Sequence, residues 1–215
     1  MSHTLSEFES KQLLREYGIA TTPEHLATDP DRAVAAATQL GFPVVLKLCG
    51  RAIAHKTERD LVRLNLIDAG MVRAAATELL AKKQPADGDA QLLVQAMVHG
   101  RREIIVGLIR DPQFGPCVML GLGGILAEAM RDVVFRMAPL SRADADDMVG
   151  DLQAAHLLGA FRGEPSIDRD ALAQVLIAVG RIGLERDAVR SLDINPLIVR
   201  GASPIAVDAL MEVAD

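Results

Sequence analysis

Apolar residues recur along the chain with two different periods. In "SEFESKQLLREYG", residues 6–18, they recur with the helical period, Ser6 and Glu9 have the spacing of a capping box, and Gly18 stands where a helix would end. The segment "PVVLKLC", residues 43–49, is instead a run of aliphatic and β-branched residues, which predicts a buried strand. The pattern therefore predicts both helices and strands near the beginning of the chain.

Helical spacing and strand-like runs continue to the end of the sequence. Helices are predicted at residues 29–41, 69–82, 141–149 and 167–182. Strands are predicted at residues 61–67, 90–98, 102–112, 115–124 and 133–140, with a closing hairpin or meander at residues 188–199 and 204–210. The segment "KKQPADGDA" has the composition of a linker. We therefore expect an α/β (α+β) fold in two lobes, residues 1–90 and 91–215, hinged near residues 84–98.

Composition narrows the class of protein. Half of the 215 residues are hydrophobic but only 3% are aromatic and none is Trp, so small and branched aliphatic side chains must build the core. A net charge of −6 disfavours a nucleic-acid partner, which needs a basic surface. The longest apolar runs are too short to span a membrane, and "MSHTLSEFESK" lacks the apolar core of a signal peptide. Cys49 and Cys117 have no CxxC partner, so we expect reduced, buried cysteines in a cytoplasmic protein with no membrane or nucleic-acid partner.

Three side chains in the first half of the chain are candidates for binding an anion. Lys47 interrupts the aliphatic run of residues 43–49, either as an edge-strand lysine that extends to water or as a charge that faces a ligand. His55 and Lys56 follow in a polar segment, where an imidazole can accept a phosphoryl group and an ammonium favours anions. Alternatively, His55 and Lys56 are ordinary loop residues. The pattern alone does not decide between a binding role and a loop.

The middle of the chain offers a carboxylate, a glycine-rich segment and an arginine. Glu103 follows Arg101 and Arg102 at the start of a predicted strand, where it is a binding residue or part of a solvated charge run. The segment "GLGG", residues 121–124, follows a buried strand and can present backbone N–H groups to an anion, although a glycine-rich turn alone is a weak signal. Arg136 lies among apolar residues in "FRMAPL", as an anion contact or as a member of a structural ion pair.

The segment "SLDINPLIVR", residues 191–200, places polar residues between two aliphatic runs. Asp193 and the Asn-Pro pair that begins at Asn195 are typical of turns, so a turn is the simplest interpretation. Asp208 lies further on, inside the apolar segment "IAVDAL". If residues 195–208 fold as a hairpin, the oxygens of Asn195 and Asp208 can reach one point, and hard oxygen ligands suit Mg²⁺.

Taken together and in order, these segments resemble a known family over nearly the whole chain. The resemblance rests on "ESKQLLREYGI", "GFPVVLKL", "IAHK", "LLVQAMV", "EIIVGLIRDPQFGPCVMLGLGGILAE", "DVVFRMAPL" and "LDINPLIV". The family is the ATP-grasp domain of NDP-forming acyl-CoA synthetases, which is the β subunit in ADP-forming acetyl-CoA synthetase and a relative of the succinyl-CoA synthetase β subunit. The resemblance implies an ATP-grasp fold with the nucleotide bound between two lobes.

The resemblance also implies which residues contact the nucleotide. Lys47 is similar to the lysine that contacts the phosphates. Gln95 and Val98 fall in the hinge that brackets adenine, and Glu103 is similar to the acid that holds the ribose. Nucleotide binding is thus expected to involve residues from both predicted lobes.

Metal and phosphoryl chemistry are implied in the same way. Asn195 and Asp208 match the family's Mg²⁺ ligands, so Mg²⁺ with ATP or ADP is the expected cofactor, and the turn interpretation is kept beside the metal role. Gly123, Gly124 and Arg136 match the segment that lines the phosphate side of the cleft.

His55 takes the position of a histidine proposed to accept phosphate transiently, with Lys56 beside it to hold the anion. Phosphoryl transfer depends mostly on positioning and on neutralising charge, which these residue types provide. His55, Lys56 and Arg136 are therefore the predicted catalytic residues.

One segment departs from the family pattern. After His-Lys the family usually reads Ser-Asp-x-Gly-Gly-Val, a glycine-rich flap over the phosphates, whereas this chain reads "HKTERDLVRL". Asp60 and Leu61 stand where the two glycines are expected, and their side chains would crowd a backbone that should approach phosphate. Either the flap is rebuilt or the nucleotide step is altered.

We therefore expect an acid–thiol ligase component that carries phosphoryl transfer for acyl-CoA + ADP + Pi ⇌ acid + CoA + ATP. The resemblance implies that CoA and the acyl group are handled by an α subunit or by fused CoA-binding and ligase domains. An alternative from another class is an ATP-sensing module without turnover, such as the ATP-grasp part of a protein acetyltransferase, which the altered flap favours. A free-standing ligase for another nucleophile is a third possibility, disfavoured by "IAHK" and "FRMAPL".

Overall fold

The computed structural model describes residues 2–53, 56, 58–124, 132–160 and 163–214. The chain divides into two compact units. The larger unit contains residues 1–3, 11–21 and 99–215, and the smaller unit contains residues 4–10 and 22–98. The division after Val98 lies later than the predicted boundary at residue 90, because the strand at Gln91–Ala96 completes the sheet of the smaller unit.

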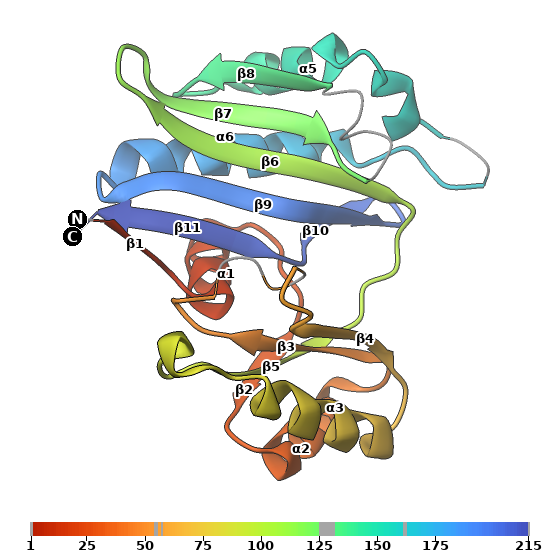
Figure 1. Cartoon of the computed structure of the whole chain (residues 1–215). Helices are drawn as coiled ribbons and strands as arrows, with labels where there is room; N and C mark the ends of the chain where they lie inside the picture. Colours follow the sequence, from red (N-terminus) through yellow and green to blue (C-terminus); the bar gives the residue numbers. More distant parts are fainter. Residues whose placement is uncertain (1, 54–55, 57, 125–131, 161–162, 215) are drawn as a thin grey trace. The chain divides into compact units, whose positions relative to one another are not determined.

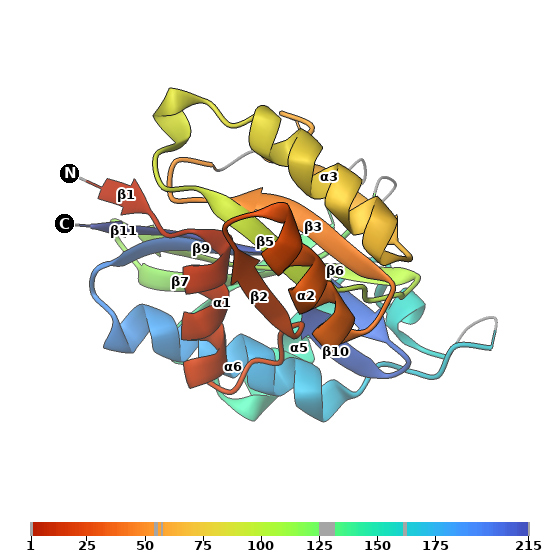
Figure 2. The same cartoon turned by 90° about the horizontal axis from the view of Figure 1, so that it is seen from below.

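The smaller unit is a four-stranded sheet with two helices on one face (Figures 1 and 2). Its strands, in sheet order, are β2 (Glu24–Ala27), β5 (Gln91–Ala96), β3 (Val44–Cys49) and β4 (Val62–Leu66). Its helices are α2 (Pro30–Leu40) and α3 (Ala69–Ala81), and a 3-10 turn η1 occupies Pro85–Asp87. The helices, β3, β4 and β5 confirm the sequence prediction, whereas β2 was not predicted.

The ends of α2 follow from local chemistry. The Asp29 side chain accepts a hydrogen bond from the Arg32 backbone N–H, and Pro30 occupies the first turn, where no N–H is needed. Gly41 ends the helix with φ 83°. Ala33, Ala36 and Ala37 face the sheet and are buried, so a core without bulky aromatics packs through small side chains.

The core of the smaller unit uses alternate residues of its strands. Val44, Leu46 and Leu48 of β3 belong to the hydrophobic cluster that contains the helices' buried residues. Because side chains alternate across a strand, Val45 and Lys47 lie on the opposite face, away from α2 and α3. The face opposite α2 and α3 thus carries a charged residue in a strand whose six residues are all buried.

The larger unit is a seven-stranded sheet with α5 and α6 on one face (Figure 1). The main strand order is β1 (Ser2–Thr4), β11 (Ala209–Ala214), β9 (Val189–Arg200), β6 (Arg102–Asp111), β7 (Gly115–Leu122) and β8 (Val133–Met137), and β10 (Ser203–Ala206) pairs with β9. The helices are α5 (Arg142–Asp151) and α6 (Arg169–Glu185), with a 3-10 turn η2 at Ala155–Leu158. The predicted closing hairpin is confirmed, since β9 pairs antiparallel with β10 and with β11.

A glycine brings α6 close to the sheet. A Cβ atom on Gly183 would lie 2.7 Å from the Pro116 Cβ and 2.9 Å from the Leu108 Cδ1. These distances are too short for real side chains, so Gly183 is needed for the close approach. The same contact shows that Leu108 is on the helix-covered face, which leaves Gly107 on the other face.

Helix α1 (Glu7–Glu16) begins in the smaller unit and continues into residues of the larger unit. The predicted capping box is confirmed: the Ser6 backbone N–H donates to Glu9 Oε2 at 2.9 Å, and the Glu9 backbone N–H donates to Ser6 Oγ at 3.3 Å. Gly18, with φ 79°, follows the helix end as predicted. Among the described residues, no helix is long and apolar enough to cross a membrane.

Candidate functional site

Lys47 is buried in the interior of a sheet. Strand β3 lies between β5 and β4, and Lys47 is 6% exposed. Its Nζ donates to Glu7 Oε1 at 2.7 Å. The interpretation of Lys47 as an edge-strand lysine that extends to water is therefore wrong. The charge is instead held inside the smaller unit by a carboxylate from α1.

Lys56 contacts the same carboxylate. Its Nζ forms a short ion pair with Glu7 Oε2, and the residue is 8% exposed. The Lys56 carbonyl accepts a hydrogen bond from the Leu61 N–H at 2.9 Å, which fixes the backbone on either side of the intervening segment. Lys56 is thus no ordinary loop residue. Its predicted catalytic neighbour His55 lies outside the described residues.

The two predicted adenine contacts lie at the end of β5. Gln95 is 2% exposed and is paired with Val45 in the sheet, so it lies on the same face as Lys47. Val98 is 7% exposed and follows the strand. The backbone between them is held by a hydrogen bond from the Met97 N–H to the Pro43 carbonyl at 3.1 Å. The smaller unit thus brings Lys47 and Gln95 to one sheet face.

In the larger unit, Glu103 lies against the glycine-rich segment. The Gly123 N–H donates to the Glu103 carbonyl at 2.8 Å. A Cβ atom on Gly123 would lie 3.0 Å from the Glu103 Cβ, so a side chain there would push against Glu103. Gly124 has φ 83°, a conformation that glycine adopts without strain. The three residues that the sequence placed around the ribose and phosphates are therefore local neighbours.

Asp193 and Asn195 lie in a strand and not in a turn. Strand β9 runs without interruption from Val189 to Arg200, so the turn interpretation is wrong. A β-bulge accommodates these residues within the strand. Ile194 pairs with Val106 and Leu197 pairs with Ile104, so Asn195 and Pro196 lie opposite a single residue of β6. Proline, which cannot donate a ladder hydrogen bond, is tolerated at such a position.

The hairpin brings Asn195 and Asp208 together, as its spacing predicted. The Asn195 N–H donates to the Asp208 carbonyl at 3.3 Å, and Asp208 lies between β10 and β11, both of which pair with β9. Asp193 joins them, because its carboxylate hydrogen-bonds the Asn195 side chain. The result is a cluster of three oxygen-bearing side chains at one end of the hairpin.

The carboxylates of Asp193 and Asp208 repel each other. Desolvation of its carboxyl group raises the pKa of Asp193, the nearby Asp208 carboxylate raises it further, and the hydrogen bond with Asn195 partly offsets the increase. Solvent still reaches the surface of Asp193 and Asn195. A cation at this cluster would relieve the repulsion between the two carboxylates.

The donors in this cluster fit Mg²⁺. Two carboxylates and one amide are hard oxygen ligands, and Mg²⁺ needs few protein ligands because it keeps water and phosphate oxygens. Within the ranges that the structure describes, no group of three or more His, Cys, Asp or Glu side chains forms a metal cage. The hard oxygen donors and the small number of carboxylates both fit a Mg²⁺ site that has few protein ligands and is completed by a phosphate oxygen.

Arg136 lies on the other face of the larger sheet. It pairs with Val118 across β7, and Val118 faces α6, so Arg136 is on the helix-covered side. Its guanidinium forms a short ion pair with Asp151 at the end of α5. Glu103 and Asp193, in phase with Gly107, are on the face opposite α5 and α6. The structure therefore does not group Arg136 with those residues, and its catalytic role stays a prediction.

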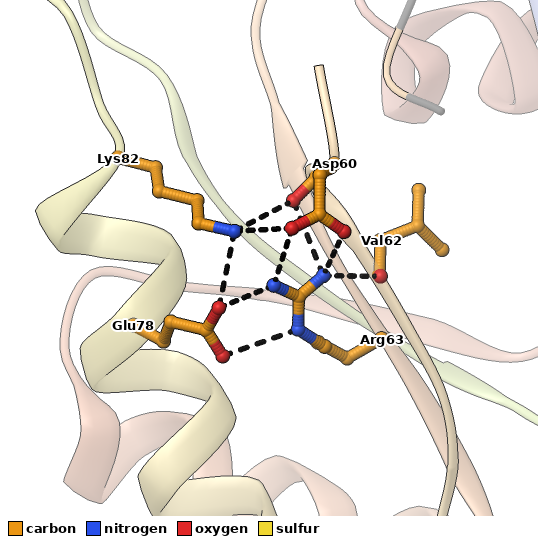
Figure 3. Close-up of polar contacts among 5 residues, drawn as sticks. All are labelled: Asp60, Val62, Arg63, Glu78 and Lys82. Carbon is orange, nitrogen blue, oxygen red and sulfur yellow. Dashed lines mark hydrogen bonds and ion pairs between the residues drawn. The ribbon is translucent and has the colours of Figure 1, made fainter. Parts of the chain in front are cut away.

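The altered flap segment is anchored by its side chains (Figure 3). Asp60 has φ 53°, the left-handed conformation that a glycine would adopt freely. Its carboxylate pairs with Arg63 at 2.7 Å and with Lys82, and these two cations lower its pKa to about 2. Arg63 and Lys82 also pair with Glu78 of α3.

The second residue of the altered pair is buried. Leu61 is 1% exposed, and its carbonyl accepts a hydrogen bond from the Leu48 N–H of β3 at 3.0 Å. Asp60 keeps the backbone conformation of a glycine while Leu61 joins the core. The fold thus accommodates both side chains in the described part of this segment, and the choice between a rebuilt flap and an altered nucleotide step stays open.

Two charged residues near the site were missed by the sequence analysis. Glu7, which holds both lysines, occurs in the quoted first helix but gives no signal there, because an acid in a first helical turn is ordinary. Lys11 is fully buried, and its Nζ donates to the Val207 carbonyl at 3.4 Å, beside Asp208. Asp193 was noticed in the sequence but was not assigned to the site.

Two mixed units with a lysine on one sheet and an oxygen cluster on the other define the ATP-grasp class. The sequence matches the ATP-grasp domain family over residues 1–213, and the chain belongs to this family. It is similar to the β subunit of ADP-forming acetate–CoA ligase I of Pyrococcus furiosus, with 38% identity over 210 residues that cover 96% of this chain and 90% of that subunit.

Other relatives differ in length. The ADP-forming acetate–CoA ligase I of Archaeoglobus fulgidus is 37% identical over 96% of this chain, which corresponds to 30% of that longer protein. The dinucleotide-forming acetyl-coenzyme A synthetase 1 of Candidatus Korarchaeum cryptofilum, solved with coenzyme A, Ca-AMPCP and HgCl+, matches with a TM-score of 0.92 and 39% identity over 99% of this chain and 94% of that chain. The predicted ATP-grasp fold and family are thus confirmed.

Proposed function

We propose that this chain is the nucleotide-binding part of an ADP-forming acyl-CoA synthetase, working with an α partner or with fused CoA-binding and ligase domains. The reaction is acyl-CoA + ADP + Pi ⇌ acid + CoA + ATP. The observation that carries the proposal is the oxygen cluster of Asp193, Asn195 and Asp208, because two neighbouring carboxylates beside an amide favour a divalent cation. Support also comes from the relatives, which occur as separate β subunits and within longer ligases.

Each unit has a distinct role in this proposal. In the smaller unit, Lys47 and Lys56 neutralise phosphate charge, and Gln95 and Val98 contact the adenine. In the larger unit, Glu103 holds the ribose beside Gly123 and Gly124. Mg²⁺, when bound, neutralises the phosphoryl group in transfer.

Asn195 and Asp208 hold the metal in this proposal. Asp193, which hydrogen-bonds Asn195, orients that amide. A cytoplasmic location is part of the proposal, since Cys49 and Cys117 are buried and neither forms a disulfide, as expected in a reducing compartment. The relatives named above are ligases and synthetases, which favours turnover over an ATP sensor.

Calorimetry with Mg-ADP tests this function. The chain should bind Mg-ADP, and Lys47→Ala should weaken binding by about 1.5–3 kcal/mol, the scale of a charged hydrogen bond. Asp208→Asn should reduce affinity strongly with Mg²⁺ present and only slightly with ADP and EDTA. Equal losses in both conditions would make the aspartate structural, and no heat with millimolar Mg-ADP or Mg-ATP would reject the proposal.

A further inference from the structure

Glu7 is a buried carboxylate held between two buried ammonium groups. It is 3% exposed and lies in the first turn of α1. One of its oxygens accepts from Lys47 Nζ at 2.7 Å, and the other forms the short ion pair with Lys56 Nζ. The three residues come from α1, from β3 and from the segment that precedes β4. One carboxylate therefore sets the positions of two cations from separate parts of the smaller unit.

The start of α1 is itself fixed, so Glu7 can act as a rigid anchor. The capping box holds Ser6 to Glu9, and Glu9 also pairs with Arg51 through bonds of 3.1 Å from the Arg51 Nε to both oxygens. The Leu61 N–H bond to the Lys56 carbonyl restrains the backbone of the second lysine. Lys47 is restrained by its place in an interior strand. The carboxylate and both lysine backbones are thus held at defined positions.

Burying three charged side chains costs desolvation free energy. Replacement of a buried ion cluster by apolar side chains is often neutral or stabilising, so such a cluster is poorly explained by packing alone. A lysine side chain has many rotamers, and fixing it before a ligand arrives reduces the cost of binding. One carboxylate accepts from both ammonium groups at once, and each ammonium group carries three N–H donors. Two ammonium groups held side by side form a geometry suited to a phosphate group.

We propose that Glu7 is a positioning residue that holds Lys47 and Lys56 ready to bind the nucleotide phosphates. This role rests on the proposed function of the site. Glu7 touches neither nucleotide nor metal; it acts through the two lysines. The carboxylate also offsets the repulsion between two neighbouring positive charges, so the two lysines stay close together before the phosphate arrives.

The test compares Glu7→Gln with Glu16→Gln in the full chain. Glu16 is at the other end of α1 and forms an exposed ion pair with Arg186 at 3.0 Å, so its variant is a matched loss of one carboxylate from the same helix. Calorimetry measures binding of Mg-ADP and of adenosine, which lacks phosphates. We expect Glu7→Gln to raise the Kd for Mg-ADP about tenfold and to leave the Kd for adenosine within about twofold. Glu16→Gln should change neither by more than about twofold.

A general structural defect would weaken both ligands, and this outcome would overturn the proposal. The proposal would also be overturned if Glu7→Gln bound Mg-ADP as tightly as the parent while Lys47→Ala bound it weakly. In the Lys47→Ala background, Glu7→Gln should have a smaller effect than in the parent, because one of its two targets is gone. Failure of the parent chain to bind Mg-ADP would instead reject the proposed function, so the two failures are distinguishable.

A second pair of variants covers the case in which Glu7→Gln does not fold. Glu7→Gln with Lys56→Met removes one negative and one positive charge together, so the summed charge of the three residues stays at +1, as in the parent. Compared with Lys56→Met alone, the double variant should bind Mg-ADP several-fold more weakly and adenosine equally well. Equal Mg-ADP affinities in these two variants would show that Glu7 does not position Lys47.

Discussion

Two carboxylates close together in α1 have different surroundings, and this determines what each can do. Glu7 is buried and faces two lysines, whereas Glu9 is partly exposed, caps its own helix and pairs with Arg51. From sequence, Glu9 was predictable because its spacing from Ser6 is that of a capping box. The partners of Glu7 were not, because they depend on which face of β3 and which part of a later segment come near the helix.

Glu9 gives a pH-dependent contribution to stability. The hydrogen bond from Arg51 is the main cause that lowers the pKa of Glu9 from 4.5 to about 2, with Ser6 adding to the effect against desolvation. A lowered pKa in the folded state means that the stabilisation is present above pH 4.5 and is lost as the pH falls toward 2. Because Glu9 is partly solvated, we expect Glu9→Gln to lower the free energy of unfolding by only about 1 kcal/mol at pH 7.

Urea titrations at a series of pH values measure this contribution. The difference between the parent and Glu9→Gln should shrink as the pH falls from 4.5 toward 2. Arg51→Met removes the same ion pair from its other side and should show the same trend. A difference that stays constant over this pH range would show that the charge of Glu9 does not contribute.

At the scale of elements, hydrophobic periodicity predicted most helices and strands, and errors fall where tertiary contacts override local chemistry. Asp193 and the Asn-Pro pair at Asn195 have turn propensity, yet they lie in β9, because its neighbours on both sides impose the strand and a bulge absorbs the proline. Strand β2 was missed because "EHLA" has no alternation. Lys47 was ambiguous because the sequence does not show whether β3 is an edge strand.

The segment between Lys56 and β4 contains a charged residue with a glycine-like backbone conformation, followed by a buried leucine. Asp60 occupies a backbone conformation suited to glycine, and exposed ion pairs to Arg63 and Lys82 hold its side chain. Leu61 is in the core. The departure from the family pattern was visible in the sequence, but the directions of the two side chains were not.

The two residues should contribute very differently to stability. Leu61→Ala leaves a cavity in the core and should lower the free energy of unfolding by about 2–4 kcal/mol. Asp60→Gly removes exposed ion pairs but also relieves the left-handed backbone, so its denaturation midpoint should stay close to that of the parent. Chemical denaturation of both variants measures this contrast. A large loss in Asp60→Gly would mean that the ion pairs in Figure 3 stabilise the fold by more than the left-handed backbone costs.

At the scale of the whole molecule, the two units contribute different chemistry. In the proposed function, the smaller unit supplies cations for the phosphates and the larger unit supplies oxygens for Mg²⁺. The sequence predicted these residue types through their resemblance to a family. It could not show that Arg136 is paired with Asp151 on the helix-covered face, since this depends on strand phase.

The last prediction concerns phosphoryl transfer in the assembled enzyme. A related synthetase was solved with coenzyme A, Mg-AMPPCP and a phosphohistidine segment pointing towards the nucleotide binding site. His55 of this chain lies outside the described residues, and its role as a phosphoryl acceptor rests on the sequence. Neutral imidazole can attack phosphorus, and the buried ammonium of the adjacent Lys56 would favour the incoming anion.

Incubation with radiolabelled Mg-ATP in the presence of the CoA-binding partner should label this chain at His55, with a phosphate that is labile in acid and stable in base. Without the partner we expect little label, because the other half of the relay is missing. His55→Ala should abolish the label while Mg-ADP affinity stays unchanged, since the histidine acts in transfer and not in binding. Label that persists in His55→Ala, or that is absent even with the partner and Mg-ATP, would remove the relay role from this histidine and leave the chain as a nucleotide-binding subunit whose phosphoryl group is accepted elsewhere.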